Sequence, residues 1–316
     1  MTGVDSAAAI AFDHCSKWYG QVLGLSDVSW STGAGVVGLL GPNGAGKSTF
    51  IKLVAGLMRP SRGRCTVFGQ PPAASRDARA RIGYAPEHDR AWDELTALEF
   101  VAALAELAGV PRRAARRRAE DALASVGMAD AMHRRIAGFS KGMRQRTKLA
   151  QALVHDPDLL LLDEPLTGVD PLARRDLISR IRDLGAAGKT VVVSSHVLPE
   201  VQAITDTVLV LHRGRVLAEG NVMRIRELID RHPHRIRVAC DRPRELAAAV
   251  VRADHVVRLS LEDGAVVVET RAPDACYDLL ADAICELDIA VTALSSPDNN
   301  LAAVFAYLTD DRGATA

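Results

Sequence analysis

The sequence lacks any hydrophobic run long enough to cross a bilayer. The longest apolar stretches, such as Val36–Leu40 and Leu159–Leu162, have the length of buried strands, whereas a membrane-spanning helix needs about 20 apolar residues. The N-terminus carries no basic region, and Ala7–Phe12 is too short for the apolar part of a secretory signal. We therefore expect a cytoplasmic chain that reaches a membrane only through a partner.

Paired cysteines and an excess of either charge are also missing. The five cysteines are scattered and form no CxxC pair, which argues against a metal or disulfide framework. Lysine plus arginine and aspartate plus glutamate both number 39, so the formal net charge is zero. Because nucleic-acid binders depend on excess positive charge, we expect no nucleic-acid partner. The arginine cluster at 112–118 invites a nucleic-acid or lipid interpretation, but we favour a solvated helix face.

The 316 residues are long enough for one large domain or two ordinary ones. Residues 10–220 alternate short apolar runs with helical stretches, which predicts an α/β core with parallel strands. The segments Val36–Leu40, Leu159–Leu162 and Thr190–Ser194 are apolar almost throughout. Such runs predict strands that are buried on both faces.

Strand signals vanish between about residues 94 and 138, where alanine, leucine, glutamate and arginine dominate. Pro111 is a plausible helix start and Gly127 a break, so this stretch predicts a helical insertion. Beyond residue 222 the pattern changes again, which predicts a separate small α+β domain over residues 223–316. Its order of strand, helix, strand, strand, helix and strand is that of a ferredoxin-like module. The expected elements are strand Arg235–Cys240, helix Pro243–Val251, strands His255–Leu261 and Ala265–Thr270, helix Pro273–Leu287, strand Ile289–Leu294 and a final helix Asn299–Leu308.

The segment Gly41–Thr49, GPNGAGKST, fits the pattern G-x-x-x-x-G-K-[ST] and follows a predicted strand. Its glycines let the backbone curl so that N–H groups point at phosphate oxygens, and a helix predicted over Phe50–Leu57 presents its positive end to the same anion. Lys47 would reach the β- and γ-phosphates of a nucleotide, and the Ser48 hydroxyl is a hard ligand for Mg²⁺. The residues expected to contact the nucleotide are Gly41, Pro42, Asn43, Gly44, Ala45, Gly46, Lys47, Ser48 and Thr49.

A second motif, Leu159–Glu164, is a buried strand that ends in two carboxylates. Ligands of open α/β sheets bind at the carboxyl ends of the strands. We expect Asp163 to hold the Mg²⁺ shell there. Glu164 would be the general base that polarises the attacking water, an effect worth about 10²–10⁴-fold in rate.

Five further segments resemble motifs of the ATP-binding-cassette (ABC) ATPases and occur in that family's order over residues 10–220, about two thirds of the chain. They are Tyr19 (adenine-stacking aromatic), Gly83–Glu87 (Q-loop), Phe139–Arg146 (signature motif), Pro165–Asp170 (D-loop) and His196 (switch histidine). The resemblance implies a P-loop NTPase fold over residues 8–222: a RecA-like core with a helical subdomain and an antiparallel β subdomain.

The resemblance also implies roles for particular residues. Tyr19 would stack on adenine, with Trp18 as the competing candidate, and His196 would contact the γ-phosphate and the attacking water. Two copies would face each other head to tail, so that Ser140 and Gly142 of one complete the phosphate site of the other.

Two departures from the commonest family pattern stand out. The Q-loop glutamine is replaced by Glu87, which could still ligate Mg²⁺ but adds a negative charge. In the signature motif, Lys141 replaces a glycine and Met143 a glutamine.

The Ser-Lys-Gly-Met form of the signature is similar to that of two-component ABC-2 type exporters, and so is the tail at 299–309. The resemblance therefore implies an ATP-hydrolysing subunit that powers export through a separate transmembrane permease on the inner face of the cell membrane. The alternative is a soluble cassette ATPase that acts on a non-transport partner such as DNA or the ribosome. One cassette, with no long coiled coil and no zinc module, argues against that alternative.

Overall fold

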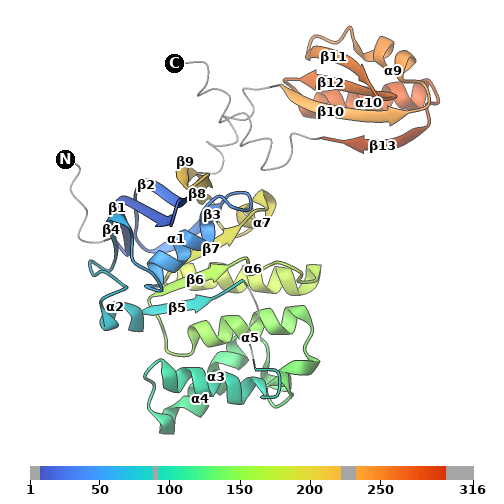
Figure 1. The fold of residues 1–316 in the computed structure, drawn as a ribbon. Helices are drawn as coiled ribbons and strands as arrows, with labels where there is room; N and C mark the ends of the chain where they lie inside the picture. The colour runs from blue at the N-terminus through green and yellow to red at the C-terminus, as the bar shows by residue number, and fades with distance from the viewer. Residues whose placement is uncertain (1–7, 88–91, 222–232, 297–316) are drawn as a thin grey trace. The chain divides into compact units, whose positions relative to one another are not determined.

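The computed structural model describes residues 8–87, 92–221 and 233–296 (Figure 1). The chain divides into two compact units, Met1–Gly220 and Asn221–Ala316. The final helix predicted over Asn299–Leu308 and most of the linker around 221–233 lie outside the described residues.

Six strands form the main sheet of the first unit, in the order β5-β6-β7-β3-β8-β9. Their bounds are β3 Gly35–Leu40, β5 Ile82–Ala85, β6 Leu159–Asp163, β7 Thr190–Ser195, β8 Thr207–His212 and β9 Arg215–Asn221. The pairs β5–β6, β6–β7, β7–β3 and β3–β8 are parallel. The three strands predicted as buried are β3, β6 and β7, each one residue longer than predicted, and the predicted α/β core with parallel strands is confirmed.

The inner strands β3, β6 and β7 are covered on both faces, which explains why they do not alternate between apolar and polar residues. Leu159 and Leu161 of β6 pack in one apolar cluster with Phe50. Leu160 and Leu162, on the opposite face, pack in the cluster that includes the helices of residues 97–186. These strands are therefore the middle layer of the unit, and polar side chains of β3, β6 and β7 occur only at the strand ends.

A second, antiparallel sheet of β1 (Ile10–Tyr19), β2 (Val22–Thr32) and β4 (Arg62–Val67) has the order β2-β1-β4. It packs against α1 (Lys47–Val54) through Phe50, whose ring stacks on that of Phe12 with centroids 4.4 Å apart. The observed helix α1, Lys47–Val54, begins and ends earlier than the helix predicted over Phe50–Leu57. Its start lies within the glycine-rich loop, and Gly56, at a φ of 72°, follows its end.

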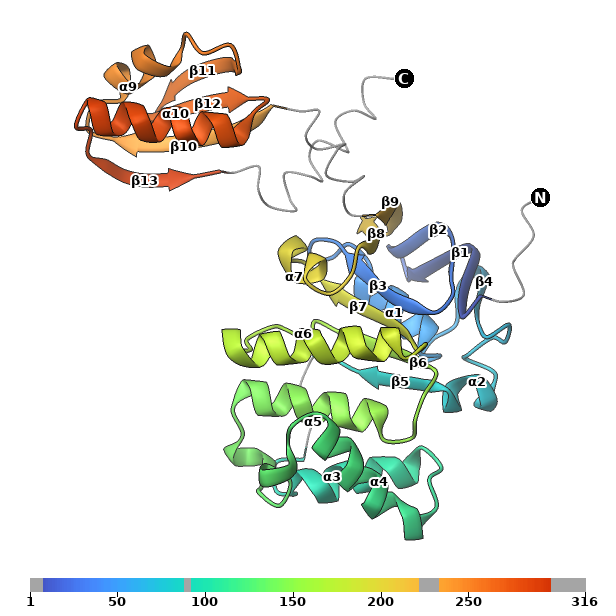
Figure 2. The same cartoon turned by 180° about the vertical axis from the view of Figure 1, so that it is seen from behind.

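Helices dominate the rest of the first unit. They are α2 Arg76–Ala80, α3 Ala97–Leu107, α4 Arg112–Ser125, α5 Lys141–Leu153, α6 Pro171–Ala186 and α7 Leu198–Gln202. Helix α3 begins with a capping box, in which the Thr96 side chain and Glu99 satisfy each other's backbone N–H groups. Helix α4 begins directly after Pro111, and Gly127, at a φ of 73°, follows its end. Helices α3, α4 and α5 lie together beyond the β5 edge of the sheet (Figures 1 and 2).

The second unit contains one antiparallel sheet in the order β11-β12-β10-β13. Along the chain its elements are β10 His234–Cys240, α9 Pro243–Val250, β11 Val256–Glu262, β12 Ala265–Thr270, α10 Pro273–Glu286 and β13 Val291–Ser295. Asp263 and Gly264, at φ of 47° and 74°, form the tight turn between β11 and β12. Both helices pack on the sheet through an apolar core of their own. The ferredoxin-like classification of this unit stays a prediction.

Candidate active site

The loop before α1 is shaped by glycines. Gly44 and Gly46 have φ angles of 80° and 107°, in the left-handed region that other residues avoid. A Cβ atom on Gly46 would lie 2.6 Å from the carbonyl oxygen of Gly24. On Gly41 it would lie 2.6 Å from the carbonyl oxygen of Leu211. The loop can therefore pass close to both neighbours and curl around the start of α1.

Helix α1 presents its amino end to the same loop. Its N-cap is Gly46, which provides no side-chain capping hydrogen bond. The first N–H groups of the helix and the positive end of its dipole therefore remain available to an anion. Lys47 and Ser48, the first residues of α1, add an ammonium and a hydroxyl at that end. Phosphate groups are the anions that such an arrangement binds.

The Lys47 ammonium is buried and surrounded by oxygen atoms. Its side chain is 8% exposed, and its Nζ lies 3.5 Å from Oε1 of Glu164. Nζ also donates to the carbonyl oxygen of Gly41 at 2.7 Å and to that of Pro42 at 3.4 Å. A buried charge needs such compensation, because an isolated ion is strongly destabilised away from water.

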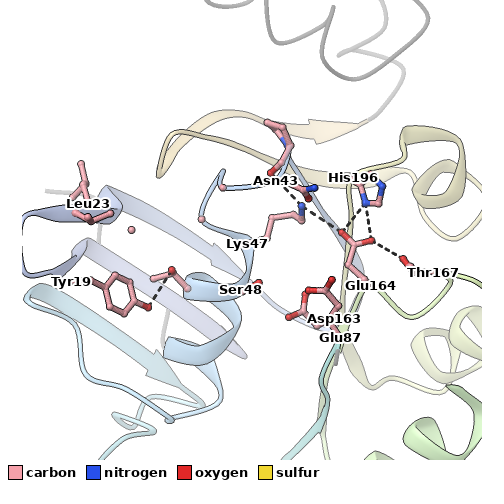
Figure 3. Close-up of a pocket in the computed structure, with 16 residues that line it drawn as sticks. Tyr19, Leu23, Asn43, Lys47, Ser48, Glu87, Asp163, Glu164, Thr167 and His196 are labelled. Carbon is pink, nitrogen blue, oxygen red and sulfur yellow. Dashed lines mark hydrogen bonds and ion pairs between the residues drawn. The ribbon is translucent and has the colours of Figure 1, made fainter. Parts of the chain in front are cut away.

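Ser194 of β7 fixes both acidic residues at the end of β6. Its hydroxyl donates to Oδ1 of Asp163 at 2.6 Å and accepts the backbone N–H of Glu164 at 2.9 Å. Asp163 and Ser194 are direct partners in the register of the two strands. Glu164 has a φ of 50°, so the chain turns as it leaves the strand and the carboxylate of Glu164 faces Lys47 (Figure 3).

His196 and Thr167 both contact the carboxylate of Glu164 (Figure 3). Nδ1 of His196 lies 3.1 Å from Oε1 and 3.0 Å from Oε2, and the Thr167 hydroxyl donates to Oε2 at 3.3 Å. An ionised carboxylate can only accept hydrogen bonds, so Nδ1 carries the proton in this pair. Lys47, His196 and Thr167 together orient the carboxylate.

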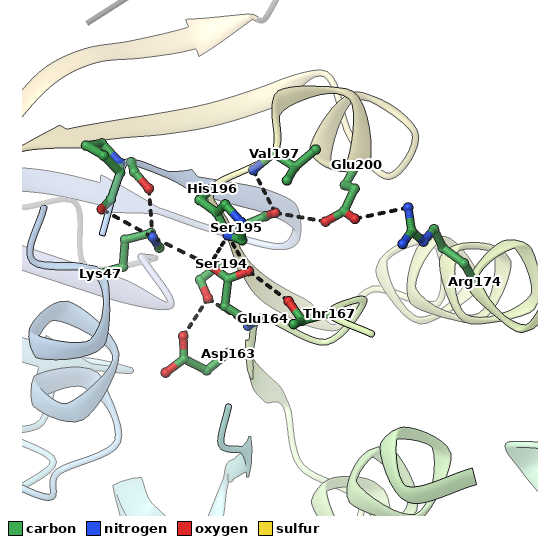
Figure 4. A network of polar contacts seen from close by, with 12 residues as sticks. Lys47, Asp163, Glu164, Thr167, Arg174, Ser194, Ser195, His196, Val197 and Glu200 are labelled. Carbon is green, nitrogen blue, oxygen red and sulfur yellow. Dashed lines mark hydrogen bonds and ion pairs between the residues drawn. The ribbon is translucent and has the colours of Figure 1, made fainter. Parts of the chain in front are cut away.

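A further series of contacts holds the backbone around His196 (Figure 4). The Ser195 hydroxyl donates to Oε2 of Glu200 at 3.0 Å and accepts the N–H of Val197 at 3.0 Å. Glu200 forms an ion pair with Arg174 of α6 at 3.2 Å. The turn from β7 to α7 is therefore fixed on both sides of His196, and the imidazole is positioned by the fold as well as by its own contact.

Lys47, Asp163, Glu164, Thr167 and His196 line one pocket of ≈ 500 Å³, a volume typical of small-molecule sites. Most residues predicted to contact ATP or Mg²⁺ line it, although they come from segments far apart in the sequence. They are Tyr19, Pro42, Asn43, Gly44, Gly46, Lys47, Ser48, Thr49, Glu87, Asp163, Glu164 and His196. Four residues that the sequence did not single out line it too: Val22, Leu23, Gly24 and Thr167.

Two residues of the loop, Gly41 and Ala45, are not among those that line the pocket. The Gly41 carbonyl holds the Lys47 ammonium. The Ala45 N–H donates to the carbonyl of Pro42 at 3.1 Å, and its own carbonyl accepts the N–H of Gly214 at 2.9 Å. Both residues therefore shape the loop from behind.

Tyr19 lines the pocket, whereas its neighbour Trp18 does not. Both side chains are largely exposed, at 44% and 43%. The Tyr19 hydroxyl lies 3.3 Å from the Thr49 hydroxyl of α1 and donates to the sulfur of Met58 at 3.2 Å. Of the two candidates for adenine stacking, the geometry favours Tyr19.

Ser140 and Gly142 do not line this pocket. Ser140 is exposed and caps α5, where its hydroxyl accepts the N–H of Met143 at 3.3 Å. Gly142 is buried at the start of α5, where a Cβ atom would lie 3.5 Å from Ala173 and from the Asp170 carboxylate. In this chain these two predicted nucleotide contacts are therefore not brought together with the residues that line the pocket.

Negative charge is concentrated at the end of β6. Burial raises the pKa of Asp163; the hydrogen bond from Ser194 opposes that rise, and the charges of Glu87 and Glu164 add to it. Burial, with the same Asp163 and Glu87 charges, raises the pKa of the nearby Tyr84 to about 12. A divalent cation would relieve this repulsion.

Ser48, Asp163 and Glu87 offer hard oxygen ligands on the pocket wall, the type that Mg²⁺ prefers. No cluster of three or more His, Cys, Asp or Glu side chains suited to a metal occurs among the described residues. Mg²⁺ characteristically takes one or two carboxylates and completes its shell with phosphates and water. The residues present therefore fit Mg²⁺ bound together with a nucleotide.

Ser194 and Thr167 are two polar residues of the site that sequence reasoning missed. Ser194 ends the predicted strand Thr190–Ser194, and Asp163 and Glu164 end the neighbouring motif. A hydroxyl at one strand end and carboxylates at another were the signal that these side chains could meet. Thr167 lies inside the D-loop-like segment, but its contact with Glu164 depends on a turn that no local pattern specifies.

Comparison with known proteins decides the family. The family model described as ABC transporter matches residues 25–167. The Nod factor export ATP-binding protein I of Burkholderia orbicola is 38% identical over 217 residues, which cover 68% of this chain and 71% of that protein. The chain belongs to the family of ABC transporter ATP-binding proteins. An ABC transporter ATP-binding protein of Nostoc sp. is 43% identical over 58% of this chain, and the match spans 56% of that relative's length.

Solved structures give the same assignment. A solved ATP-binding subunit of an ABC transporter is 34% identical and superposes with a TM-score of 0.62, covering 69% of this chain and 92% of that one. The predicted membership of the ABC family is confirmed, and the protein is an ATP-hydrolysing enzyme, the ATP-binding subunit of an ABC transporter. Among the residues that the structure describes, no helix is both long and apolar enough to span a bilayer.

We expect Asp163→Asn to raise the free energy of unfolding at neutral pH by about 1 kcal/mol, a gain typical of relieving functional strain. The pKa of Asp163 is raised in the folded chain from its ordinary 3.8, so the folded state holds the proton more tightly than the unfolded state. Stability is therefore lost as pH rises from that ordinary value through the folded pKa. Asparagine retains the oxygen that accepts from Ser194 but carries no charge.

Urea unfolding of both proteins between pH 4 and 8 measures this effect. The advantage of the variant should be largest at neutral pH and shrink as pH falls through the folded pKa of Asp163. Asp206→Asn, at an exposed carboxylate of the same unit, is the control for the loss of one negative charge. A variant that is less stable than the parent at neutral pH would contradict a raised pKa of Asp163 in the folded chain.

Proposed function

We propose that this chain powers export by a separate transmembrane permease, through ATP-driven association of two copies of its first unit. The observation that supports the proposal most strongly is the convergence of Lys47, Asp163 and Glu164 on one pocket. The export part is supported by the Ser-Lys-Gly-Met form of the signature motif and by the name of the Burkholderia relative, a Nod factor export protein.

In this proposal the glycine-rich loop holds the phosphates of ATP. Backbone N–H groups between Pro42 and Thr49 and the amino end of α1 bind the phosphate oxygens. Lys47 exchanges its present oxygen partners for those of the β- and γ-phosphates. Tyr19, on the opposite wall, stacks on the adenine, beside the apolar Val22 and Leu23.

Mg²⁺ would be held by Ser48 and Asp163, with Glu87 as a direct ligand or through water. When bound, it neutralises charge that develops on the phosphates. Glu87 lines the pocket beside Asp163 (Figure 3). Its extra negative charge, where the commonest family pattern has glutamine, adds to the repulsion that raises the pKa of Asp163.

Glu164 acts as the general base for the attacking water. In the structure its carboxylate is engaged by Lys47, His196 and Thr167. Once the phosphates attract the Lys47 ammonium, one oxygen of Glu164 loses its cationic partner and becomes a better acceptor for the proton of the water. His196 and Thr167 continue to orient the carboxylate, and His196, which lines the same pocket, would contact the γ-phosphate.

The second copy supplies Ser140 and Gly142. Both lie outside the pocket at the amino end of α5, a second helix end suited to an anion. A head-to-tail pair would bring this end against the γ-phosphate of the facing copy. Since neither copy alone encloses the nucleotide, ATP would hold the pair together and hydrolysis would release it.

The permease would contact the segment from Glu87 through helices α3 and α4. This segment joins the pocket to the helices, because Lys148 of α5 donates to the carbonyls of Pro86 and Glu87 at 3.1 and 3.0 Å. A movement at Glu87 would therefore be transmitted to the helical subdomain. The chain would lie on the inner face of the cell membrane, attached through the permease.

We expect Glu164→Gln to bind ATP, dimerise and lose hydrolysis by about 10²–10⁴-fold, the usual contribution of a general base. Glutamine keeps the size and the contact with Thr167 but cannot accept a proton from water. Phosphate release and size-exclusion chromatography with ATP and Mg²⁺ measure the two effects. Glu106→Gln, at an exposed glutamate of α3, should retain both activities, and strictly monomeric elution over a wide concentration range would argue against the model.

A second pair of variants tests whether Ser140 acts on the facing copy. Ser140→Asp and Ser140→Asn should both preserve the cap of α5, because Asp and Asn are as good as Ser at that position. In a Glu164→Gln background, the aspartate should abolish ATP-dependent dimerisation by repelling the γ-phosphate, while the asparagine dimerises. Both should bind ATP equally as monomers, so weaker ATP binding by the monomeric aspartate variant would place Ser140 in its own pocket.

The permease is tested with the neighbouring reading frame. We expect it to encode a chain with about six hydrophobic spans, and its co-expression to retain this chain in the membrane fraction. The control is the membrane fraction of cells that produce this chain alone. A neighbour without such spans, together with an unchanged distribution of the chain, would favour a partner outside transport.

A further inference from the structure

A second cavity, of ≈ 320 Å³, lies at the carboxyl end of α1. The amino end of the same helix forms the active site. The walls of this second cavity are mostly apolar, with contributions from Leu53, Met58, Pro72 and Ala73. Its size falls in the range of small-molecule sites. None of the residues that line it also lines the nucleotide pocket.

Two arginines, Arg59 and Arg64, add positive charge to this apolar cavity. Within the described part of the chain, neither guanidinium takes part in an ion pair. Asp13 is the β1 partner of Arg64 in the strand register, but the two side chains form no such pair. Lys17 donates to the carbonyl of Arg59 at 2.9 Å and brings a further ammonium nearby.

We propose that this cavity binds a small organic anion with an apolar body, such as a medium-chain carboxylate. The apolar walls would take the body, and the guanidinium groups would take the carboxylate. Arginine matches a carboxylate well because its planar fork donates two parallel hydrogen bonds. An inorganic anion would leave the apolar walls unfilled, and a neutral lipid tail would leave both exposed guanidinium groups with water alone as a partner.

Met58 connects this cavity to the nucleotide pocket. It lines the cavity, and its sulfur accepts the hydroxyl hydrogen of Tyr19 at 3.2 Å. Tyr19 lines the nucleotide pocket and also approaches Thr49 of α1. An occupant packed on Met58 restricts the thioether and so holds the Tyr19 ring in place, which tightens ATP binding. This coupling rests on the proposed stacking of adenine on Tyr19, whereas binding in the cavity does not.

Calorimetric titration of the full chain with octanoate, octanol and acetate tests the site. Octanoate should bind saturably at one site per chain, and the other two, which lack the charge or the apolar body, should not. Arg59→Gln combined with Arg64→Gln should weaken octanoate binding by about tenfold or more. Arg62→Gln, on the same strand but outside the cavity lining, should bind as the parent does.

Three results would overturn the site: no saturable octanoate binding, equal binding of octanol, or unchanged binding by the double arginine variant. Unchanged ATP affinity of the double variant in the absence of octanoate verifies that it is folded. The outcome does not depend on whether the chain serves an exporter.

The coupling is measured as the ATP dissociation constant of the Glu164→Gln chain with and without saturating octanoate. We expect about fivefold tighter ATP binding, and by reciprocity ATP should tighten octanoate binding by the same factor. Met58→Leu keeps the volume but removes the acceptor for Tyr19, so it should bind octanoate without this effect. If octanoate leaves the ATP affinity unchanged, the coupling alone is refuted. If the chain binds no ATP, the proposed function is refuted instead.

Discussion

The buried ion pair between Lys47 and Glu164 is the interaction on which the rest of the site depends. Both side chains are nearly inaccessible, at 8% and 7% exposed, and neither charge would be tolerated there alone. The ammonium reaches this position only because Gly44 and Gly46 let the loop curl around the start of α1. The carboxylate reaches it because Glu164 leaves its strand in a left-handed conformation. Loop and strand end therefore constrain each other through a single electrostatic contact.

The parallel sheet explains how residues so distant in sequence meet with this accuracy. In the register of β3, β6 and β7, Leu40 lies opposite Ser195 and Asp163 opposite Ser194. The carboxyl ends of the three strands thus fall at one edge, which is where ligands of open α/β sheets bind. The strands themselves are apolar because both faces are covered. The apolar strands therefore hold the polar residues at their carboxyl ends in fixed positions, and the interiors of the strands contribute no polar side chains to the site.

Local sequence patterns predicted the parts of this site that are locally encoded. The apolar runs gave β3, β6 and β7 to within a residue, and the glycine-lysine pattern located Lys47 and Ser48. Patterns failed where a role depends on a distant neighbour. Ser194 contacts Asp163, which lies 31 residues away in the sequence, through the register of β6 and β7. The helix start at Lys47 was missed because its cap is a glycine in a left-handed conformation, which provides none of the usual capping signals.

The charge distribution also suggests why ATP binding and hydrolysis would occur in that order. Asp163, Glu164 and Glu87 place negative charge at one strand end, and the ammonium of Lys47 contacts Glu164 there. In the proposed function, incoming phosphates compete with Glu164 for that cation. The competition alone would be unfavourable, because it adds anions to an anionic site. It becomes favourable if Mg²⁺ arrives with the nucleotide and neutralises Asp163 and Glu87. Nucleotide binding would then separate Glu164 from Lys47 and leave the carboxylate, still oriented by His196 and Thr167, free to act as a base.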